Sequence, residues 1–165
     1  MLLPTAVEQI KSVDLTQDPE KLCQPIGPFR MMAREGMKIE LAHARGAIVM
    51  LFEDVSHGHI RTIVLGPLSQ EPRPPMWQGN SFGHWDGNTL VIDTVGFNER
   101  TWLNRAGAQH SDALHLVERV RPILGGRYLE YKVTAEDPQA LVKPYTYTRY
   151  FEKVTTEIQE DVCEP

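Results

Sequence analysis

The sequence lacks the extended runs that mark membrane and nucleic-acid proteins. No stretch approaches the roughly 18 consecutive apolar residues of a membrane-spanning helix, and Lys and Arg form no cluster. The formal net charge of -5 argues against nucleic acid or an anionic membrane as a partner. Residues 1–10 also lack the basic start and the apolar centre of a signal peptide. We therefore expect a chain that is soluble as given, with any export signal already removed.

Complete motifs of known chemistry are absent too. The chain contains no Gly-rich phosphate loop, no nucleophile elbow, no CxxC pair and no internal repeat. Its 165 residues, with 41% hydrophobic and 24% charged side chains, have the length and composition of one soluble globular domain. We expect a single domain over residues 1–165, made of an N-terminal arm (1–30) and a β-barrel (31–165).

Cysteine occurs at only two positions, Cys23 before the first strong strand and Cys163 near the end of the chain. This placement predicts a disulfide that staples the two ends together, and the alternative is two unrelated buried thiols. In the chain-entropy model, a disulfide across so long a loop stabilises the fold by roughly 5 kcal/mol at most. A disulfide also implies an oxidising compartment.

What the sequence does contain is a series of short β-rich runs separated by turn residues. The predicted hairpins pair 39–44 with 47–52, 81–85 with 89–95, 113–123 with 128–134, and 145–153 with 157–163, and a further strand is predicted at 59–65. Gly-containing turns such as Asp86-Gly87-Asn88 supply the positive φ angles that hairpins need. A proline-rich stretch, 66–75, predicts a loop.

Helical periodicity is nearly absent after residue 35, and residues 1–30 combine a helix-compatible stretch with several prolines, which predicts an irregular arm. Successive β runs at short spacing predict an all-β fold, either an antiparallel β-barrel or a β-sandwich. We favour a barrel, lipocalin-like or of a related small type, because closure removes unpaired sheet edges. Such barrels commonly hold one small ligand.

The most suggestive candidate for catalysis is His110 with Asp112. A histidine changes charge near neutral pH, and a nearby carboxylate can orient the ring and support its protonated form. In an extended chain these two side chains project to the same side while Ser111 points away, so a Ser-His-Asp triad is not expected. The alternative is that Ser111 and Asp112 cap a turn and that His110 is solvated.

Asp93 is a further catalytic candidate. Within 89–95 it shares a strand face with Val91 and Val95, where a carboxylate must be paired or hydrogen-bonded. The alternative is that Asp93 lies near the strand end and caps the turn that follows.

The segment 96–103 is too polar for a core strand and unusually aromatic for a loop. Such a mixture is typical of the rim of a small-molecule site, where rings give contact area and side chains such as Asn98 and Arg100 give directional hydrogen bonds. We expect Trp77 and Trp102 to line the same pocket. The alternative for Trp102 is a plug at the end of the core.

An aromatic stripe is predicted along 145–153, where Tyr145, Tyr147 and Phe151 share one face of the strand. Their phenol hydroxyls indicate a polar cavity, because phenylalanine would serve a dry core equally well. Arg149 lies on the same face and is expected to be near solvent or paired with a carboxylate.

A metal site would begin with His57 and His59, which lie on one face of a possible strand, a spacing seen in metal-binding barrels. Zinc or iron would need further donors, for which Glu53, His84 and His115 are candidates. The commoner outcome for such a pair is a loop without metal, so we expect no metal and no cofactor.

One long stretch of the chain is distinctive as a whole. The sequence WQGNSFGHWDGNTLVIDTVGFNERTWL at 77–103, followed by Gly107, HSDALH at 110–115 and Glu118-Arg119, resembles a large family of uncharacterised bacterial proteins whose members usually look exported. That family also has a Cys-x-Pro-x-Gly segment before the first strand, as at 23–27 here, and a cysteine near the end. The resemblance spans residues 23–165. It implies export to the periplasm or the medium and supports the disulfide, but it implies no activity.

These observations lead to one main hypothesis, a cofactor-independent lyase or isomerase that acts by acid-base chemistry on a mostly apolar small molecule in the barrel, with aromatic compounds among the candidate substrates. His110 with Asp112 would move the proton, and Asn98 with Arg100 would stabilise developing negative charge. The other expected pocket residues are Trp77, His84, Trp102, His115, Tyr145 and Tyr147. The alternatives are a secreted binding protein for a hydrophobic molecule, without catalysis, and a metal-dependent enzyme. The oligomeric state stays open.

Overall fold

A computed structural model describes residues 2–53, 60–69, 71, 73–159 and 163. Its elements are α1 (Pro4–Ser12), the 3-10 helix η1 (Leu15–Gln17), α2 (Pro28–Met31), β1 (Ile39–Ala44), β2 (Ala47–Phe52), β3 (Ile60–Leu65), β4 (Asn80–Asp86), β5 (Thr89–Val95), β6 (His115–Ile123), the 3-10 helix η2 (Leu124–Gly126), β7 (Tyr128–Glu136) and β8 (Tyr145–Glu152). Among these residues no helix is long and apolar enough to cross a membrane.

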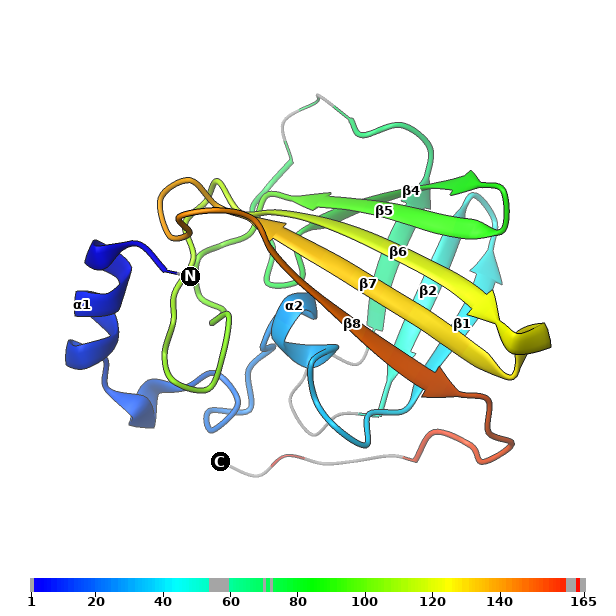
Figure 1. Cartoon of the computed structure of the whole chain (residues 1–165), viewed down its shortest axis with the longest axis horizontal. Coiled ribbons are helices and arrows are strands. Elements are labelled where there is room, and N and C mark those ends of the chain that lie inside the picture. Colours follow the sequence, from blue (N-terminus) through cyan, green and yellow to red (C-terminus); the bar gives the residue numbers. More distant parts are fainter. Residues whose placement is uncertain (1, 54–59, 70, 72, 160–162, 164–165) are drawn as a thin grey trace.

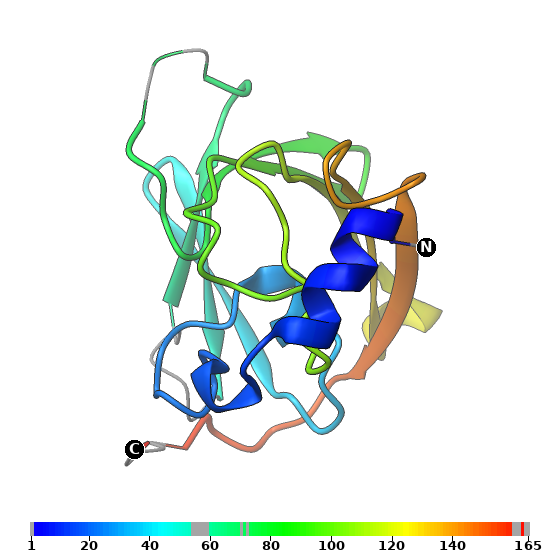
Figure 2. The same cartoon turned by 90° about the vertical axis from the view of Figure 1, so that its left-hand side faces the viewer.

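The eight strands form one sheet in chain order, from β1 at one edge to β8 at the other (Figure 1). The sheet curls into a half-barrel (Figure 2), which confirms the predicted all-β, barrel-like fold. In the part of the chain that the structure describes, no ladder joins β1 to β8. The sheet therefore keeps two edges that a closed barrel would not have.

One strand pair differs from the expected antiparallel pattern. β3 and β4 are parallel, with Ile63 opposite Ser81 and Leu65 opposite Gly83. Parallel neighbours require a crossover, and the 66–79 connection supplies it by carrying the chain back before β4 begins. All other neighbouring pairs are antiparallel.

Most predicted hairpins are confirmed. They form where the sequence places turn residues, which act locally. The β1–β2 hairpin and β5 have the predicted bounds, and Gly46 and Gly87 take the positive φ angles of 71° and 61° that these turns need. The predicted last hairpin is wrong over its described part, since residues 153–159 form no strand, and 160–162 lie outside the described residues. Their backbone is held instead at Lys153, whose N–H donates to the Arg127 carbonyl, and at Gln159, whose N–H donates to Glu53.

The N-terminal arm is irregular, as predicted, and closes one end of the half-barrel, where α1 crosses the opening (Figure 2). Short helix α2 inserts buried side chains, including Met31, into the concave side of the sheet. Buried Arg30 pairs with Asp18 at 2.7 Å and Glu20 at 2.6 Å, which fixes the arm to α2. Because the arm lies against the core, the concave side near α2 is filled rather than hollow.

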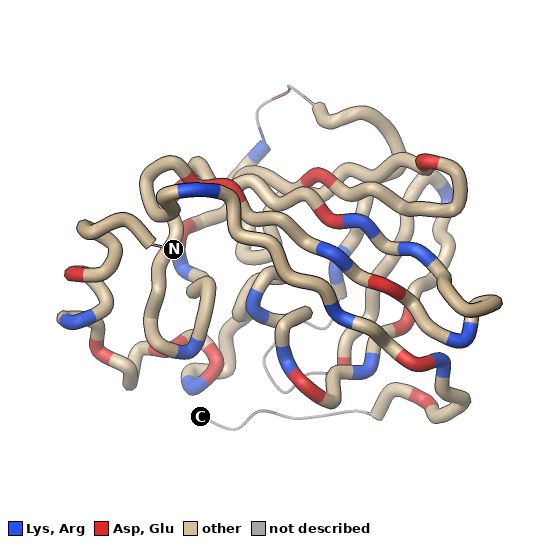
Figure 3. The backbone as a smooth tube through the Cα atoms, in the orientation of Figure 1, with Lys and Arg blue, Asp and Glu red and all other residues tan. Residues whose placement is uncertain are grey.

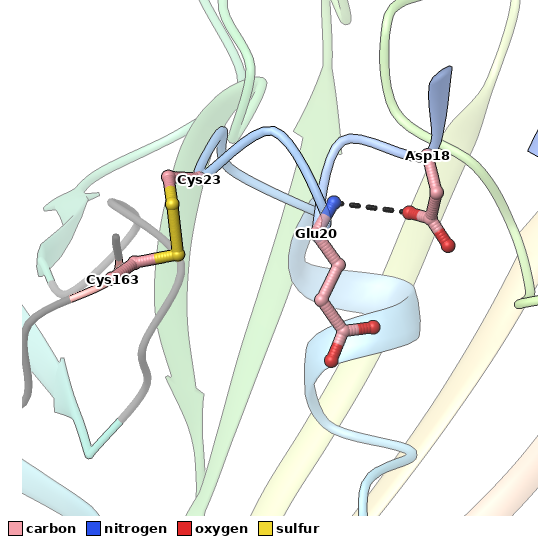
Figure 4. The surroundings of a disulfide bond; sticks show 4 residues. All are labelled: Asp18, Glu20, Cys23 and Cys163. Atoms are coloured by element: carbon pink, nitrogen blue, oxygen red, sulfur yellow. Dashed lines mark hydrogen bonds between the residues drawn. A yellow bond between two sulfur atoms is a disulfide. The ribbon is translucent and has the colours of Figure 1, made fainter. Parts of the chain in front are cut away.

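The predicted disulfide between Cys23 and Cys163 is confirmed (Figure 4), which excludes two unrelated thiols. It links residues 140 positions apart in the sequence, with Cα atoms 5.6 Å apart. The disulfide therefore ties the N-terminal arm to the segment that follows β8.

Candidate functional site

The structure does not bring His110 and Asp112 together. His110 is 6% exposed, and its ring contacts the Thr101 hydroxyl through Nε2 at 2.7 Å and the Ser111 carbonyl through Nδ1 at 2.9 Å. Since a carbonyl only accepts, Nδ1 carries the proton and Nε2 accepts from Thr101. Burial lowers the pKa of His110, which favours this neutral form, while the Ser111 contact partly opposes the shift. Asp112 is exposed in the turn before β6.

Asp93 does have a histidine partner, but it is His115. The two lie on neighbouring strands β5 and β6, with Asp93 Oδ1 and His115 Nε2 3.0 Å apart. Each side chain is more than a quarter exposed, because both point to the convex side of the sheet. The register partner of Asp93 on β4 is Phe82, which is covered by the Arg73 guanidinium at 4.9 Å. The structure thus forms a half-exposed imidazole–carboxylate pair from two residues of the sequence prediction.

The other predicted rim residues gather on loops at the end of the sheet that carries α1. The Arg100 guanidinium lies 5.7 Å from the centre of the Trp77 ring, and Asn98 accepts a hydrogen bond from the Arg100 backbone N–H at 3.2 Å. Trp102 is only 5% exposed, as expected for a plug at the end of the core, and its backbone forms an isolated antiparallel β-bridge with Gln109. His84 is exposed on the convex side of β4.

The aromatic stripe on β8 packs against α2. Tyr147 donates from its hydroxyl to the Phe29 carbonyl, and the Phe29 ring lies 5.1 Å from the Tyr147 ring and 6.1 Å from the Tyr145 ring. Burial raises the pKa of the Tyr147 phenol far above its usual range. Tyr147 is therefore a protonated donor that holds α2, while Tyr145 remains half exposed.

A buried polar belt across the concave side was missed by the sequence analysis. Arg61 of β3 donates to Glu118 of β6 at 2.8 Å and to Thr94 of β5 at 2.6 Å, and Tyr131 of β7 donates to Glu118 at 2.7 Å. Ser81 accepts from Arg61 Nε at 3.0 Å. Burial raises the pKa of the Tyr131 phenol. These five side chains are at most 4% exposed, so the belt is closed to solvent.

The position of Glu118 in the sequence indicates a buried polar contact. Glu118 alternates with Leu116 and Val120 along β6, which places a carboxylate on the apolar, concave face of the strand. Such a carboxylate requires a buried partner. The pattern does not identify the partner, because Arg61 lies 57 positions away in the sequence.

A groove of about 1030 Å³ lies between the two edges of the sheet. Its walls include concave-side residues of both edges, Ile39 and Leu41 of β1 and Arg149 and Phe151 of β8, together with Leu129 of β7, the register partner of Phe151. Residues 153–159, which we call the strap, follow β8, and 153–158 of them also line the groove. We refer to this hollow as the β1–β8 groove.

The β1–β8 groove lies one layer of side chains away from the buried belt. The Phe151 ring is 6.5 Å from the Tyr131 ring, whose hydroxyl bonds Glu118. Next along β8, Arg149 donates to the Ala33 carbonyl at 2.8 Å. None of His110, Asp112, Asp93 and His115 lines the groove. The groove is therefore a space for binding rather than a site equipped with the acid-base pairs expected from the sequence.

The two histidines on which the metal hypothesis depends, His57 and His59, lie outside the described residues. Among the described residues, no group of three or more His, Cys, Asp and Glu side chains is arranged to hold a metal ion. Glu53, one of the proposed further donors, is paired with Lys38 at 2.9 Å.

Comparison of the chain with protein-family models, with curated proteins and with solved structures gives no match. The resemblance to the exported bacterial family therefore stays a prediction.

Proposed function

We propose that this chain is a binding protein that holds a mostly apolar small molecule in the β1–β8 groove and performs no chemistry on it. The observation that carries the proposal is the groove itself, about 1030 Å³ in volume and opening where two sheet edges remain unpaired. Small-molecule sites are typically concave, largely apolar and provided with a few polar groups. The concave-side part of this groove has that composition, because Ile39, Leu41, Leu129 and Phe151 lie there together with Arg149, while further charged residues such as Lys38 and Lys153 lie along its wall.

Export is part of the same proposal. The confirmed disulfide is compatible with an oxidising compartment, and disulfides are rare in proteins that stay in the cytosol. A periplasmic or secreted protein that captures a hydrophobic compound fits both the disulfide and the groove.

The direct test is ligand protection against thermal unfolding. The oxidised protein would be heated with a panel of alkyl and aromatic compounds, with dodecanol and nonylphenol as the first probes. A ligand at a hundred times its Kd stabilises the folded state by about 2.7 kcal/mol, which shifts the melting temperature by several degrees. Absence of protection by every compound in the panel would overturn the proposal.

Two matched variants connect protection to the groove. Leu41→Trp places a large ring in the groove and should abolish protection, because Leu41 lines it. Leu68→Trp makes the same change at an equally exposed leucine that does not line the groove, and should retain protection. Equal protection of both variants would place binding elsewhere.

A second candidate, the acid-base lyase or isomerase, is favoured by one observation, the 3.0 Å contact between Asp93 and His115. Compounds that protect the protein would be incubated with it and followed by mass spectrometry. Conversion by the wild type that disappears in His115→Gln would favour this candidate. Unchanged compounds would leave binding as the function.

A further inference from the structure

Arg149 occupies an unusual position on β8. Its strand neighbours on the concave face are Tyr147 and Phe151, and its register partner on β7 is the fully buried Tyr131. A charged side chain on such a face is expected to have a counter-ion or to remain near solvent. Arg149 is exposed, and the space that keeps it accessible is the β1–β8 groove, which it lines.

The guanidinium of Arg149 has few partners. One N–H donates to the Ala33 carbonyl at 2.8 Å, and the guanidinium carbon lies 5.9 Å from the centre of the Tyr147 ring. In the described part of the chain, no carboxylate lies within ion-pair distance of it. A guanidinium carries five N–H donors, so most of its capacity is unused by the protein.

A second arginine on the concave face shows the contrast. Arg61 is fully buried, and all of its nitrogen atoms bond to Glu118, Thr94 or Ser81. The fold thus neutralises the arginine that it seals inside the sheet. Within the described residues, Arg149, which faces the groove, has no such counter-ion.

Several other charged groups of the groove wall are paired with neighbours or lie on the opposite face of their strand. Lys38 pairs with Glu53 at 2.9 Å, and Glu152 pairs with Arg127 at 3.1 Å. Glu40 belongs to the convex face of β1, opposite to that of Ile39 and Leu41. Glu35 and Glu157 line the groove from the loop before β1 and from the strap, beyond ion-pair distance of Arg149. Two further cations line the groove, Arg34, which pairs with Glu20 at 3.4 Å, and Lys153 at the start of the strap. Arg149 differs from them in lying on the concave face of a strand, between Tyr147 and Phe151, where the apolar part of a bound molecule would also lie.

We infer that the ligand of the β1–β8 groove is an amphiphile with an anionic group, a carboxylate in its simplest form, that pairs with Arg149. The apolar part of the ligand lies against Ile39, Leu41, Leu129 and Phe151, and the anionic end lies near α2, because Arg149 bonds to Ala33 just beyond that helix. A guanidinium can bind a carboxylate through two parallel hydrogen bonds. This inference rests on the proposed binding function and specifies its ligand class.

The experiment compares dodecanoic acid with dodecanol by isothermal titration calorimetry, because the two differ only in the polar end. The wild type should bind the acid more tightly than the alcohol. Arg149→Met keeps the length of the side chain and removes its charge, and should weaken binding of the acid by about ten- to a hundredfold while changing that of the alcohol by less than about threefold. Arg121→Met, which removes an exposed arginine from outside the groove, is the matched control.

Arg149→Lys separates charge from geometry, since a lysine retains the charge but not the two parallel bonds, and it should give intermediate affinity. Circular dichroism would establish that each variant is folded. If the acid and the alcohol bind the wild type equally and Arg149→Met weakens neither, the binding function stands and the anionic ligand is overturned. If neither compound binds the wild type, both the ligand class and the groove as its site are overturned.

Discussion

Arg61 and Glu118 form an ion pair with almost no exposure to solvent, 1% and 0% for the two side chains. Removing two charges from water costs several kcal/mol for each ion, and attraction between them offsets this only when further hydrogen bonds complete the site. Thr94, Ser81 and Tyr131 supply those bonds. The belt thus adds side-chain hydrogen bonds across five consecutive strands, β3 to β7, to the backbone ladders that already join them.

Glu118→Gln is expected to lower the free energy of unfolding by about 3–5 kcal/mol, because Arg61 would keep its charge without a carboxylate in a buried site. Urea denaturation measures the loss. The control, Glu130→Gln, removes the carboxylate of the Arg121–Glu130 pair on the convex side and should cost about 1 kcal/mol or less. Equal losses in the two variants would contradict a special role for the belt.

A pH effect on stability is expected from His110. Burial lowers its pKa in the folded chain below the ordinary value of 6.5, so the unfolded chain binds a proton more readily than the folded chain. Its contribution to stability is therefore complete above pH 6.5 and is lost as the pH falls from there to the lowered pKa. Urea denaturation between about pH 5 and 8 would show this slope in the wild type and a smaller slope in His110→Gln. Identical slopes in the two proteins would show that His110 does not cause the pH dependence of stability.

At the scale of elements, sequence-based prediction succeeded where the information is local. The turn at Gly87 and the alternation of Leu90, Ile92 and Thr94 with their neighbours are enough to define β5 and its hairpin. The parallel contact of β3 with β4 was missed, because it depends on the path of a connection without periodicity. The described start of the final predicted strand, 157–159, is not a strand for a related reason, since the strap is held by contacts to Arg127 and Glu53, both distant in sequence.

The site was harder to predict than the strands. Local spacing suggested His110 with Asp112, yet the turn before β6 buries the first and exposes the second. Asp93 and His115 were both chosen from the sequence, but their contact requires the register of β5 against β6. The β1–β8 groove forms between the first and last strands of the sheet, so no local pattern contains it.

The loop that leads into β4 offers a test of how closely elements pack. Gly79 and Gly36 both have positive φ, 65° and 74°, but a methyl group at Gly79 would lie 2.7 Å from Thr94 and 2.9 Å from Phe97, whereas Gly36 has open space. Gly36→Ala should cost about 1 kcal/mol from backbone strain alone. Gly79→Ala should cost about 1–3 kcal/mol more, from overpacking. Similar losses of unfolding free energy for the two variants, measured in urea, would show that the loop at Gly79 shifts to accommodate the added methyl group without cost.

At the scale of the whole molecule, charge is dispersed rather than concentrated. Figure 3 shows Lys and Arg interleaved with Asp and Glu along β6, β7 and β8. The pairs Arg119–Asp86, Arg121–Glu130 and Arg127–Glu152 belong to this surface. Such a surface gives no positive field to attract a polyanion, in keeping with a small-molecule ligand.

The disulfide connects the ends of the chain around the groove. Cys23 belongs to the arm that is fixed to α2, and Cys163 follows the strap that lines the groove. Without the disulfide, the described backbone contacts of the strap are the hydrogen bonds of Lys153 and Gln159. We therefore expect the disulfide to have two separable effects. It restricts the unfolded chain, and it holds the strap in place at the groove wall.

Replacing both cysteines by serine is expected to lower the free energy of unfolding by about 2–5 kcal/mol, because the unfolded chain regains the freedom that the long loop had lost. The same variant should bind dodecanoic acid several-fold more weakly at a temperature where it remains folded, since part of the binding energy is then used to order the strap. Calorimetry on the folded variant separates the two effects. A stability loss with unchanged affinity would mean that the strap keeps its place without the disulfide, held by Glu53 and Arg127 alone.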